Sequence, residues 1–178
     1  MDPNVLHNLN YGVYIVSSNK LDALNGQIAN TVFQITSEPV MTAISINKEN
    51  LTHEFIEASS HFSVSVLREE TPLQFIGKFG FKTGRKEDKF KDLGYKRLES
   101  GCPVVLDHAI CYFEAKVQCK FDCGTHTLFL GRMTGSEMIR QGKPMTYEYY
   151  HLVKRGTTPR SAPTFIKGEV FNKEGDKK

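Results

Sequence analysis

Residues 25–39 read NGQIANTVFQITSEP, and this stretch combines a strand-like pattern with an unusual number of polar side chains. Val32, Phe33 and Ile35 are typical strand formers. Amides and hydroxyls nevertheless occupy positions where a plain core strand would carry valine or isoleucine, namely Asn25, Gln27, Asn30, Thr31 and Gln34. Such a polar strand is either an edge or turn segment that satisfies its side chains locally, or a strand that faces a bound ligand.

Length and composition favour a single globular domain. The chain has 178 residues, of which 39% are hydrophobic and 24% charged, and these values exclude the disordered and fibrous classes. The net charge of +3 gives no indication of a nucleic-acid or membrane surface, and no apolar run approaches the roughly 20 residues that span a bilayer. The start, MDPNVLHNLN, lacks the basic and apolar regions of a signal peptide, so we expect a cytoplasmic protein.

Strand patterns dominate the remainder of the chain. In HFSVSVL, residues 61–67, strict alternation places Phe62, Val64 and Val66 on one face. Further strands are expected over residues 11–18 and 40–47, and over a long hairpin formed by 109–121 and 126–139.

Helices are few and short. Asn50 is placed to cap a helix over residues 51–59, and Thr71-Pro72-Leu73-Gln74 fits a capping box with proline at the first helical position, in a helix that ends near Gly80. The charged stretch 82–92 is expected to be a loop. Many strands, two short helices and no βαβ rhythm predict a mainly β protein, an antiparallel barrel with helical insertions.

The C-terminal part of the chain shows no periodicity. From Gly156 the sequence GTTPRSAPTF carries two prolines, and a Lys- and Glu-rich end follows. We therefore expect one domain over residues 1–165 and a disordered tail over 166–178.

The four cysteines leave two interpretations open. Cys119 and Cys123 are spaced C-x3-C, which differs from the C-x2-C pair of a zinc ribbon, and no second pair follows. Ordinary thiols, as also expected for Cys102 and Cys111, are one interpretation. A metal site or a redox pair at positions 119 and 123 is the other.

Three further polar stretches accompany residues 25–39. SINKENLT, residues 45–52, brings hydroxyls and amides to a helix N-terminus, where free backbone N–H groups favour anions. FKTGRKEDKF, residues 81–90, gathers Thr, Gly, Arg and Lys in one loop. GTHT, residues 124–127, begins a strand with an imidazole.

Taken in this order, the four stretches resemble the flavin reductase-like proteins with an FMN-binding split β-barrel. Within that family the likeness is greatest to the flavin domain of high-molecular-weight rubredoxins, which are NADH:rubredoxin oxidoreductases, and to flavoredoxin. The resemblance covers roughly residues 5 to 165. It implies an antiparallel barrel of Greek-key type, and a homodimer with FMN at the subunit interface.

The resemblance also implies roles for individual residues. It implies contacts of Ala29, Asn30 and Thr31 with the flavin or its ribityl chain, and of Ser45, Asn47, Asn50 and Thr52 with the ribityl and phosphate groups. The loop from Phe81 to Lys89 would close over the flavin, with Thr83, Gly84 and Arg85 at the phosphate, and His126 would lie near the nicotinamide or flavin ring as a catalytic residue.

Each of these residues also has an ordinary structural interpretation. Arg85 and Lys89 stand in a charge run, which is usually a solvated loop, and His126 fits a strand-end histidine bonded to backbone. Tyr147, Tyr149 and Tyr150 are expected to pack in the core and at dimer surfaces, and stacking of one of them on a nicotinamide or flavin ring is the alternative.

The implied activity is transfer of electrons from NAD(P)H through FMN to an acceptor such as rubredoxin, a ferric complex or free flavin. The chain lacks the paired C-x2-C motifs of rubredoxin, so that partner would be a separate polypeptide. Two alternatives share the same motifs: a flavoredoxin-like electron carrier without a nicotinamide site, and the flavin reductase component of a two-component monooxygenase. The sequence distinguishes neither NADH from NADPH nor FMN from FAD.

Overall fold

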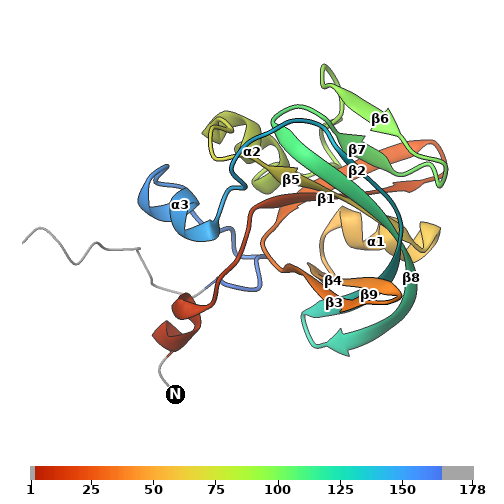
Figure 1. The fold of residues 1–178 in the computed structure, drawn as a ribbon, viewed down its shortest axis with the longest axis horizontal. Coiled ribbons are helices and arrows are strands. Elements are labelled where there is room, and N and C mark those ends of the chain that lie inside the picture. Colours follow the sequence, from red (N-terminus) through yellow and green to blue (C-terminus); the bar gives the residue numbers. More distant parts are fainter. Residues whose placement is uncertain (1–2, 166–178) are drawn as a thin grey trace, which may run out of the picture.

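The computed structural model describes residues 3–165, and most of their strands belong to one curved antiparallel sheet (Figure 1). Its seven strands follow the spatial order β2-β1-β5-β8-β9-β4-β3. Their bounds are β1 Tyr14–Lys20, β2 Ala23–Ala29, β3 Val32–Ser37, β4 Val40–Asn47, β5 His61–Leu67, β8 Ala109–Cys123 and β9 His126–Met138. The expected mainly β, antiparallel fold is confirmed.

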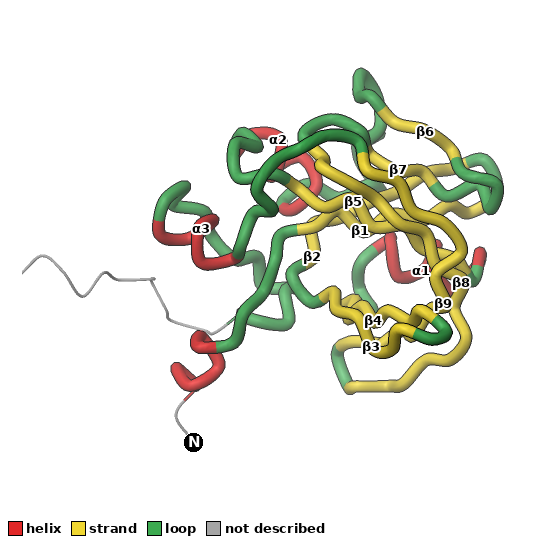
Figure 2. Tube along the Cα trace, in the orientation of Figure 1, coloured by secondary structure: helices red, strands yellow, loops and turns green. Residues whose placement is uncertain are grey.

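Smaller elements lie around this sheet (Figure 2). A two-stranded sheet is formed by β6 (Tyr95–Arg97) and β7 (Pro103–Val105). Helix α1 (Leu51–Ser59) contacts β1, β2, β4 and β5, and α2 (Leu73–Gly80) contacts β2. A 3-10 helix, η1 (Pro3–Asn8), and α3 (Tyr147–Leu152) lie on the same side of the fold as the two described ends of the chain.

The stretch 25–39 forms two strands, which corrects the prediction of a single polar strand. β2 ends at Ala29 and β3 begins at Val32, and these strands are the two opposite edges of the seven-stranded sheet. Only Asn30 and Thr31 connect them, and the Thr31 carbonyl accepts a hydrogen bond from Ser45 N at 3.2 Å. Because two residues bridge the edges, the sheet must curl until those edges approach each other, as in a split barrel.

Strands β1 and β5 are buried on both faces, so the core has two parts. One part joins Val16, Phe62 and Val64 to residues of β4, β9 and α1. The other joins Ile15 and Leu67 to α2, α3 and the loop after α2. The alternation expected for residues 61–67 is present, but the serines of β5 are buried as well because they bond to β7. The second part of the core, which includes α2, α3 and the loop after α2, therefore supports the loops around the site.

The helix starts differ in detail from the expectations. Asn50 is the N-cap of α1, but its side chain makes no capping hydrogen bond. Pro72 is the N-cap of α2 and not its first helical residue, and Thr71 donates to the Arg68 carbonyl, so no capping box forms. Helix α3 was not expected. The domain boundary at 165 stays a prediction, and the predicted disorder of 166–178 lies outside the described residues.

Candidate functional site

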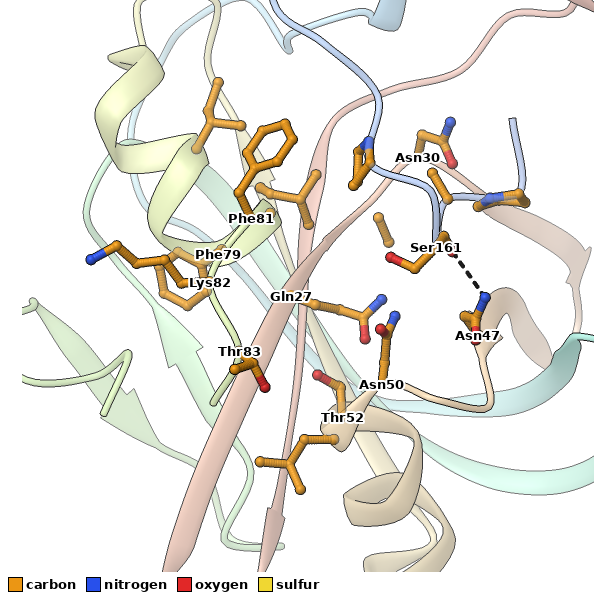
Figure 3. Close-up of a pocket in the computed structure, with 18 of the residues that line it drawn as sticks. Gln27, Asn30, Asn47, Asn50, Thr52, Phe79, Phe81, Lys82, Thr83 and Ser161 are labelled. Carbon is orange, nitrogen blue, oxygen red and sulfur yellow. Dashed lines mark hydrogen bonds between the residues drawn. The ribbon is translucent and has the colours of Figure 1, made fainter. Parts of the chain in front are cut away.

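A pocket of about 280 Å³ lies where β2, the start of α1, the loop after α2 and a C-terminal segment meet (Figure 3). Eleven residues that the sequence singled out line it: Ala29, Asn30, Ser45, Asn47, Asn50, Thr52, Phe81, Thr83, Gly84, Lys89 and His126. They come from five separate elements and loops. The curled sheet therefore brings the four polar stretches of the sequence to one place.

One wall of the pocket is built on β2 and α1. Asn25 Nδ2 donates to Thr52 Oγ1 at 2.8 Å, and both side chains are buried. Gly84 packs against the same amide, since a Cβ at this position would overlap with Asn25 Oδ1. The loop after α2 can approach the strand this closely only because residue 84 has no side chain. Gly84 and Thr52 were predicted as site residues from the sequence, and Asn25 was not.

The N-terminus of α1 opens into this pocket. Asn50 and Thr52 both line it, and the first helical hydrogen bond runs from His53 N to the Asn50 carbonyl at 3.0 Å. The N–H groups of Leu51 and Thr52 precede that bond and have no helical acceptor. Figure 3 shows the hydroxyls of Thr52 and Thr83 facing each other, with the Asn50 amide beside Gln27. Free N–H groups, the helix dipole and hydroxyls in this arrangement suit an anionic group.

Gln27 lies next to this cluster and was missed by the sequence analysis as a site residue. Its side chain points into the pocket in Figure 3, and its Oε1 is buried without a hydrogen-bond partner among residues 3–165. Buried carbonyl oxygens in native proteins almost always accept a hydrogen bond. The unsatisfied oxygen is therefore in position to accept a hydrogen bond from a group bound in the pocket.

Lys89 contributes a buried amine at the edge of β2. Its Nζ donates to the Gly26 carbonyl at 3.0 Å and to the Phe79 carbonyl at 3.2 Å, and the residue is 5% exposed. Burial lowers the pKa of Lys89 to about 8, although Glu87 acts in the opposite direction. The loop 82–92 is thus not uniformly solvated, because Lys89 and Phe90 are both buried.

The opposite wall is the segment 157–165, which we call the C-terminal strap. Thr157, Pro159, Ser161, Ala162 and Pro163 of the strap line the pocket. The Ser161 carbonyl accepts from Asn47 Nδ2 at 3.3 Å and lies 3.2 Å from His126 Nε2. Asn30 Nδ2 donates to Thr164 Oγ1 at 2.8 Å. The sequence analysis gave the strap no role, because it has no periodicity and its partners are distant in the chain.

Two expected site residues lie outside the pocket. Thr31 donates to the Asn30 side chain at 3.2 Å, at the crossing between β2 and β3. Arg85 forms an ion pair with Glu54 of α1 and lines a shallow groove on the other side of the loop. Of the three tyrosines, Tyr147 and Tyr150 line the pocket and Tyr149 does not. Tyr147 Oη lies within hydrogen-bond distance of Thr158 and Thr164 in the strap.

The cysteines do not pair with one another. Cys119 and Cys123 lie four residues apart on the extended strand β8, about 13 Å at the usual rise per residue. A disulfide requires Cα atoms within about 7 Å, so an internal bridge between them is excluded.

Among residues 3–165 no cluster of three or more His, Cys, Asp or Glu side chains has the geometry to hold a metal ion, and no helix is long and apolar enough to cross a membrane.

Comparison with known proteins places this geometry in context. Residues 6–156 match the family described as flavin reductase like domain. The chain is 54% identical to a high molecular weight rubredoxin of Moorella thermoacetica over 97% of this chain and 76% of the relative. It is 45% identical to a ferric-chelate reductase (NAD(P)H) of Archaeoglobus fulgidus over 95% of this chain and 100% of the relative.

Solved structures share the fold at low sequence identity. The flavin reductase HpaC complexed with NADP+ superposes with a TM-score of 0.70 at 23% identity, covering 81% of this chain and 89% of that one. Flavoredoxin of Methanosarcina acetivorans gives a TM-score of 0.67 at 21% identity over 76% of this chain and 74% of that one. These matches show the fold, and the expected split-barrel class is confirmed.

Proposed function

Because the chain belongs to the flavin reductase like domain family, we propose that it is an NAD(P)H-dependent oxidoreductase with FMN held between β2, α1 and the loop 81–89. The observation that carries this proposal is the convergence of eleven expected residues, from five parts of the chain, on one pocket. Bound FMN would supply the redox chemistry, and the protein would bind, orient and shield it.

The residues present fit such a cofactor. We assign its phosphate to the start of α1, where Asn50, Thr52 and Thr83 offer donors, and Gly84 lets the loop that carries Thr83 pack close to β2. Gln27 lies beside Asn50 in Figure 3, so we assign the donor that its Oε1 lacks to a hydroxyl of the ribityl chain, which adjoins the phosphate. Arg85 points to Glu54, so the phosphate role implied for it has no support from its position.

The acceptor is proposed from the relatives. The names high molecular weight rubredoxin and ferric-chelate reductase (NAD(P)H) support a separate rubredoxin or a ferric complex as the group that receives the electrons. The likeness to flavoredoxin keeps a carrier without a nicotinamide site as the second candidate. We place the protein in the cytoplasm, where the exposed thiols of Cys119 and Cys123 would stay reduced.

We also propose that the protein is a homodimer with the pocket at the interface. The register pairs Phe33 with Ala43 and Ala43 with Leu130 across three strands, and likewise pairs Ser45 with Leu128 and Leu128 with Phe121. Directly paired residues share one face of a sheet, so these apolar side chains lie on the same face as the pocket residue Ser45. Phe33 and Phe121 are 47% and 54% exposed.

A second chain would also complete the pocket. Its volume of about 280 Å³ is just below the range of about 300–1,000 Å³ typical of small-molecule sites. A flavin nucleotide would extend beyond it, onto the face that carries Phe33 and Phe121. Sedimentation should therefore find a dimer. Phe121→Glu should shift this dimer to monomer. Leu21→Glu, at an exposed position on the β1–β2 turn, should leave the dimer unchanged. A wild-type monomer would contradict this arrangement.

Anaerobic titration of the FMN-loaded protein with NADH or NADPH tests the activity. Stoichiometric bleaching of the visible flavin band within the turnover time is the expected result. A bound flavin that both nucleotides leave oxidised would replace the oxidoreductase with the carrier. Failure to bind flavin would reject both.

A further inference from the structure

The surroundings of His126 fix the roles of both its ring nitrogens. A carbonyl oxygen can only accept, so the Nε2 that lies 3.2 Å from the Ser161 carbonyl must carry the proton. In the neutral ring Nδ1 is then the acceptor, and Thr125 Oγ1 lies 2.9 Å from it. Both ring nitrogens therefore have a hydrogen-bond partner within the chain.

Asn47 acts on the same carbonyl from the neighbouring strand. Residues 47 and 126 are directly paired in the β4–β9 ladder, and Asn47 Nδ2 donates to the Ser161 carbonyl at 3.3 Å (Figure 3). The Asn47 side chain is itself fixed, because its Oδ1 accepts from Glu49 N at 3.0 Å. Two donors on adjacent strands thus converge on one oxygen of the C-terminal strap.

The strap depends on such side-chain bonds. Its backbone hydrogen bonds form short-range turns, from Ala162 N to the Pro159 carbonyl and from Phe165 N to the Ala162 carbonyl. Its hydrogen bonds to the sheet come from side chains, namely those of Asn30, Asn47 and His126. Loss of one anchor should therefore let the strap leave the pocket more often.

We infer that His126 is a positioning residue, which together with Asn47 holds the Ser161 carbonyl and keeps the C-terminal strap in place as a wall of the pocket. This inference rests on the proposed function for its effect on activity, and it revises the catalytic role that the family resemblance implied. The strap supplies Pro159, Ser161, Ala162 and Pro163 to the pocket, so its displacement would open one side of the cofactor site.

Limited trypsin digestion tests the inference without any cofactor. Arg160 is exposed and immediately precedes Ser161, so cleavage after it, identified by mass, reports how often the strap is released. His126→Ala and Asn47→Ala should each speed this cleavage about fivefold or more, as loss of one hydrogen bond implies. His126→Gln keeps a side-chain N–H donor and should restore the wild-type rate. His61→Ala, a histidine outside the pocket, is the matched control.

Reduction by NADH in the same variants gives the second measurement. If His126 anchors the strap, His126→Gln should retain most of the rate of reduction by NADH, and His126→Ala should lose it. If both variants lose it equally and the Arg160 cleavage rate is unchanged, His126 acts on the reacting groups and the inference is wrong. If His126→Ala does not fold, Asn47→Ala provides the same comparison. Failure of all variants and wild type to react with NADH, with cleavage changed as expected, would reject the proposed function and keep the anchor.

Discussion

The two walls of the pocket are held by different kinds of interaction. The strand wall is formed by residues 25–29, the start of α1, Gly84 and Lys89. Its β2 residues belong to the sheet ladder, and the buried side chains of Asn25 and Thr52 bond to each other. The C-terminal strap belongs to no ladder and is held by side chains that reach it from other elements. The strand wall should therefore determine affinity for the cofactor, and the strap should determine access to it.

The largest effect should follow from filling the space at Gly84. A Cβ there would overlap with Asn25 Oδ1, so Gly84→Val must push the loop away from β2 and from the start of α1. We expect flavin affinity, measured by fluorescence titration, to fall about a hundredfold, equivalent to about 2.7 kcal/mol. Gly135→Ala on β9, where an added Cβ meets nothing within 4 Å, should leave affinity unchanged. If Gly84→Val and Gly135→Ala lowered flavin affinity equally, the close packing of Gly84 in the strand wall would not determine that affinity.

Lys89 should give the strand wall a distinctive dependence on pH. Its pKa in the folded protein is about 8, below the ordinary value of 10.5, because burial disfavours the charged amine. Between these two values the unfolded chain binds more protons than the folded one, so this group makes the unfolding free energy rise with pH. The total change should be about 3–4 kcal/mol, since the folded and unfolded pKa values differ by about 2.5 and each pH unit contributes up to about 1.4 kcal/mol.

Denaturant unfolding of the wild type and Lys89→Met across this range measures the effect. The stability of the wild type relative to the variant should increase from about pH 8 to 10.5, because the variant has no amine to titrate. A difference that stays constant with pH would show that Lys89 is charged at no cost in the folded protein.

The smallest effects compare one hydrogen bond from each wall. Thr52→Val leaves the buried Asn25 amide without its acceptor and should lower the unfolding free energy by about 1–3 kcal/mol. Asn30→Ala removes a donor to Thr164 in the strap, where water can replace it, and should lower it by less than about 1 kcal/mol. Thermal or denaturant unfolding measures both losses. A larger loss of unfolding free energy for Asn30→Ala than for Thr52→Val would contradict the division into a buried strand wall and a releasable strap.

The sequence predicted the strand wall better than the strap for a physical reason. Strand alternation and helix-start signals are local, so residues 40–47, 51–59 and 61–67 were assigned the bounds that the structure has. Asn50, Thr52 and Gly84 were assigned to the site from the family resemblance of the short stretches 45–52 and 81–90, in which they lie. Ser161 could not be assigned, because its partners Asn47 and His126 are 114 and 35 residues away and a proline-rich segment has no period. The direction of Arg85 likewise depends on a tertiary partner, Glu54.

The position of Lys89 at the edge of β2 has a consequence for the solution behaviour of the protein. An edge strand presents unpaired backbone groups on which another chain can add by strand pairing, and covering the edge with a loop is one means of blocking this. Lys89 Nζ occupies the Gly26 carbonyl on that edge. The same side chain that helps to shape the pocket thus protects the sheet against aggregation, so a protein that loses this lysine should be less soluble even where its flavin chemistry is not required.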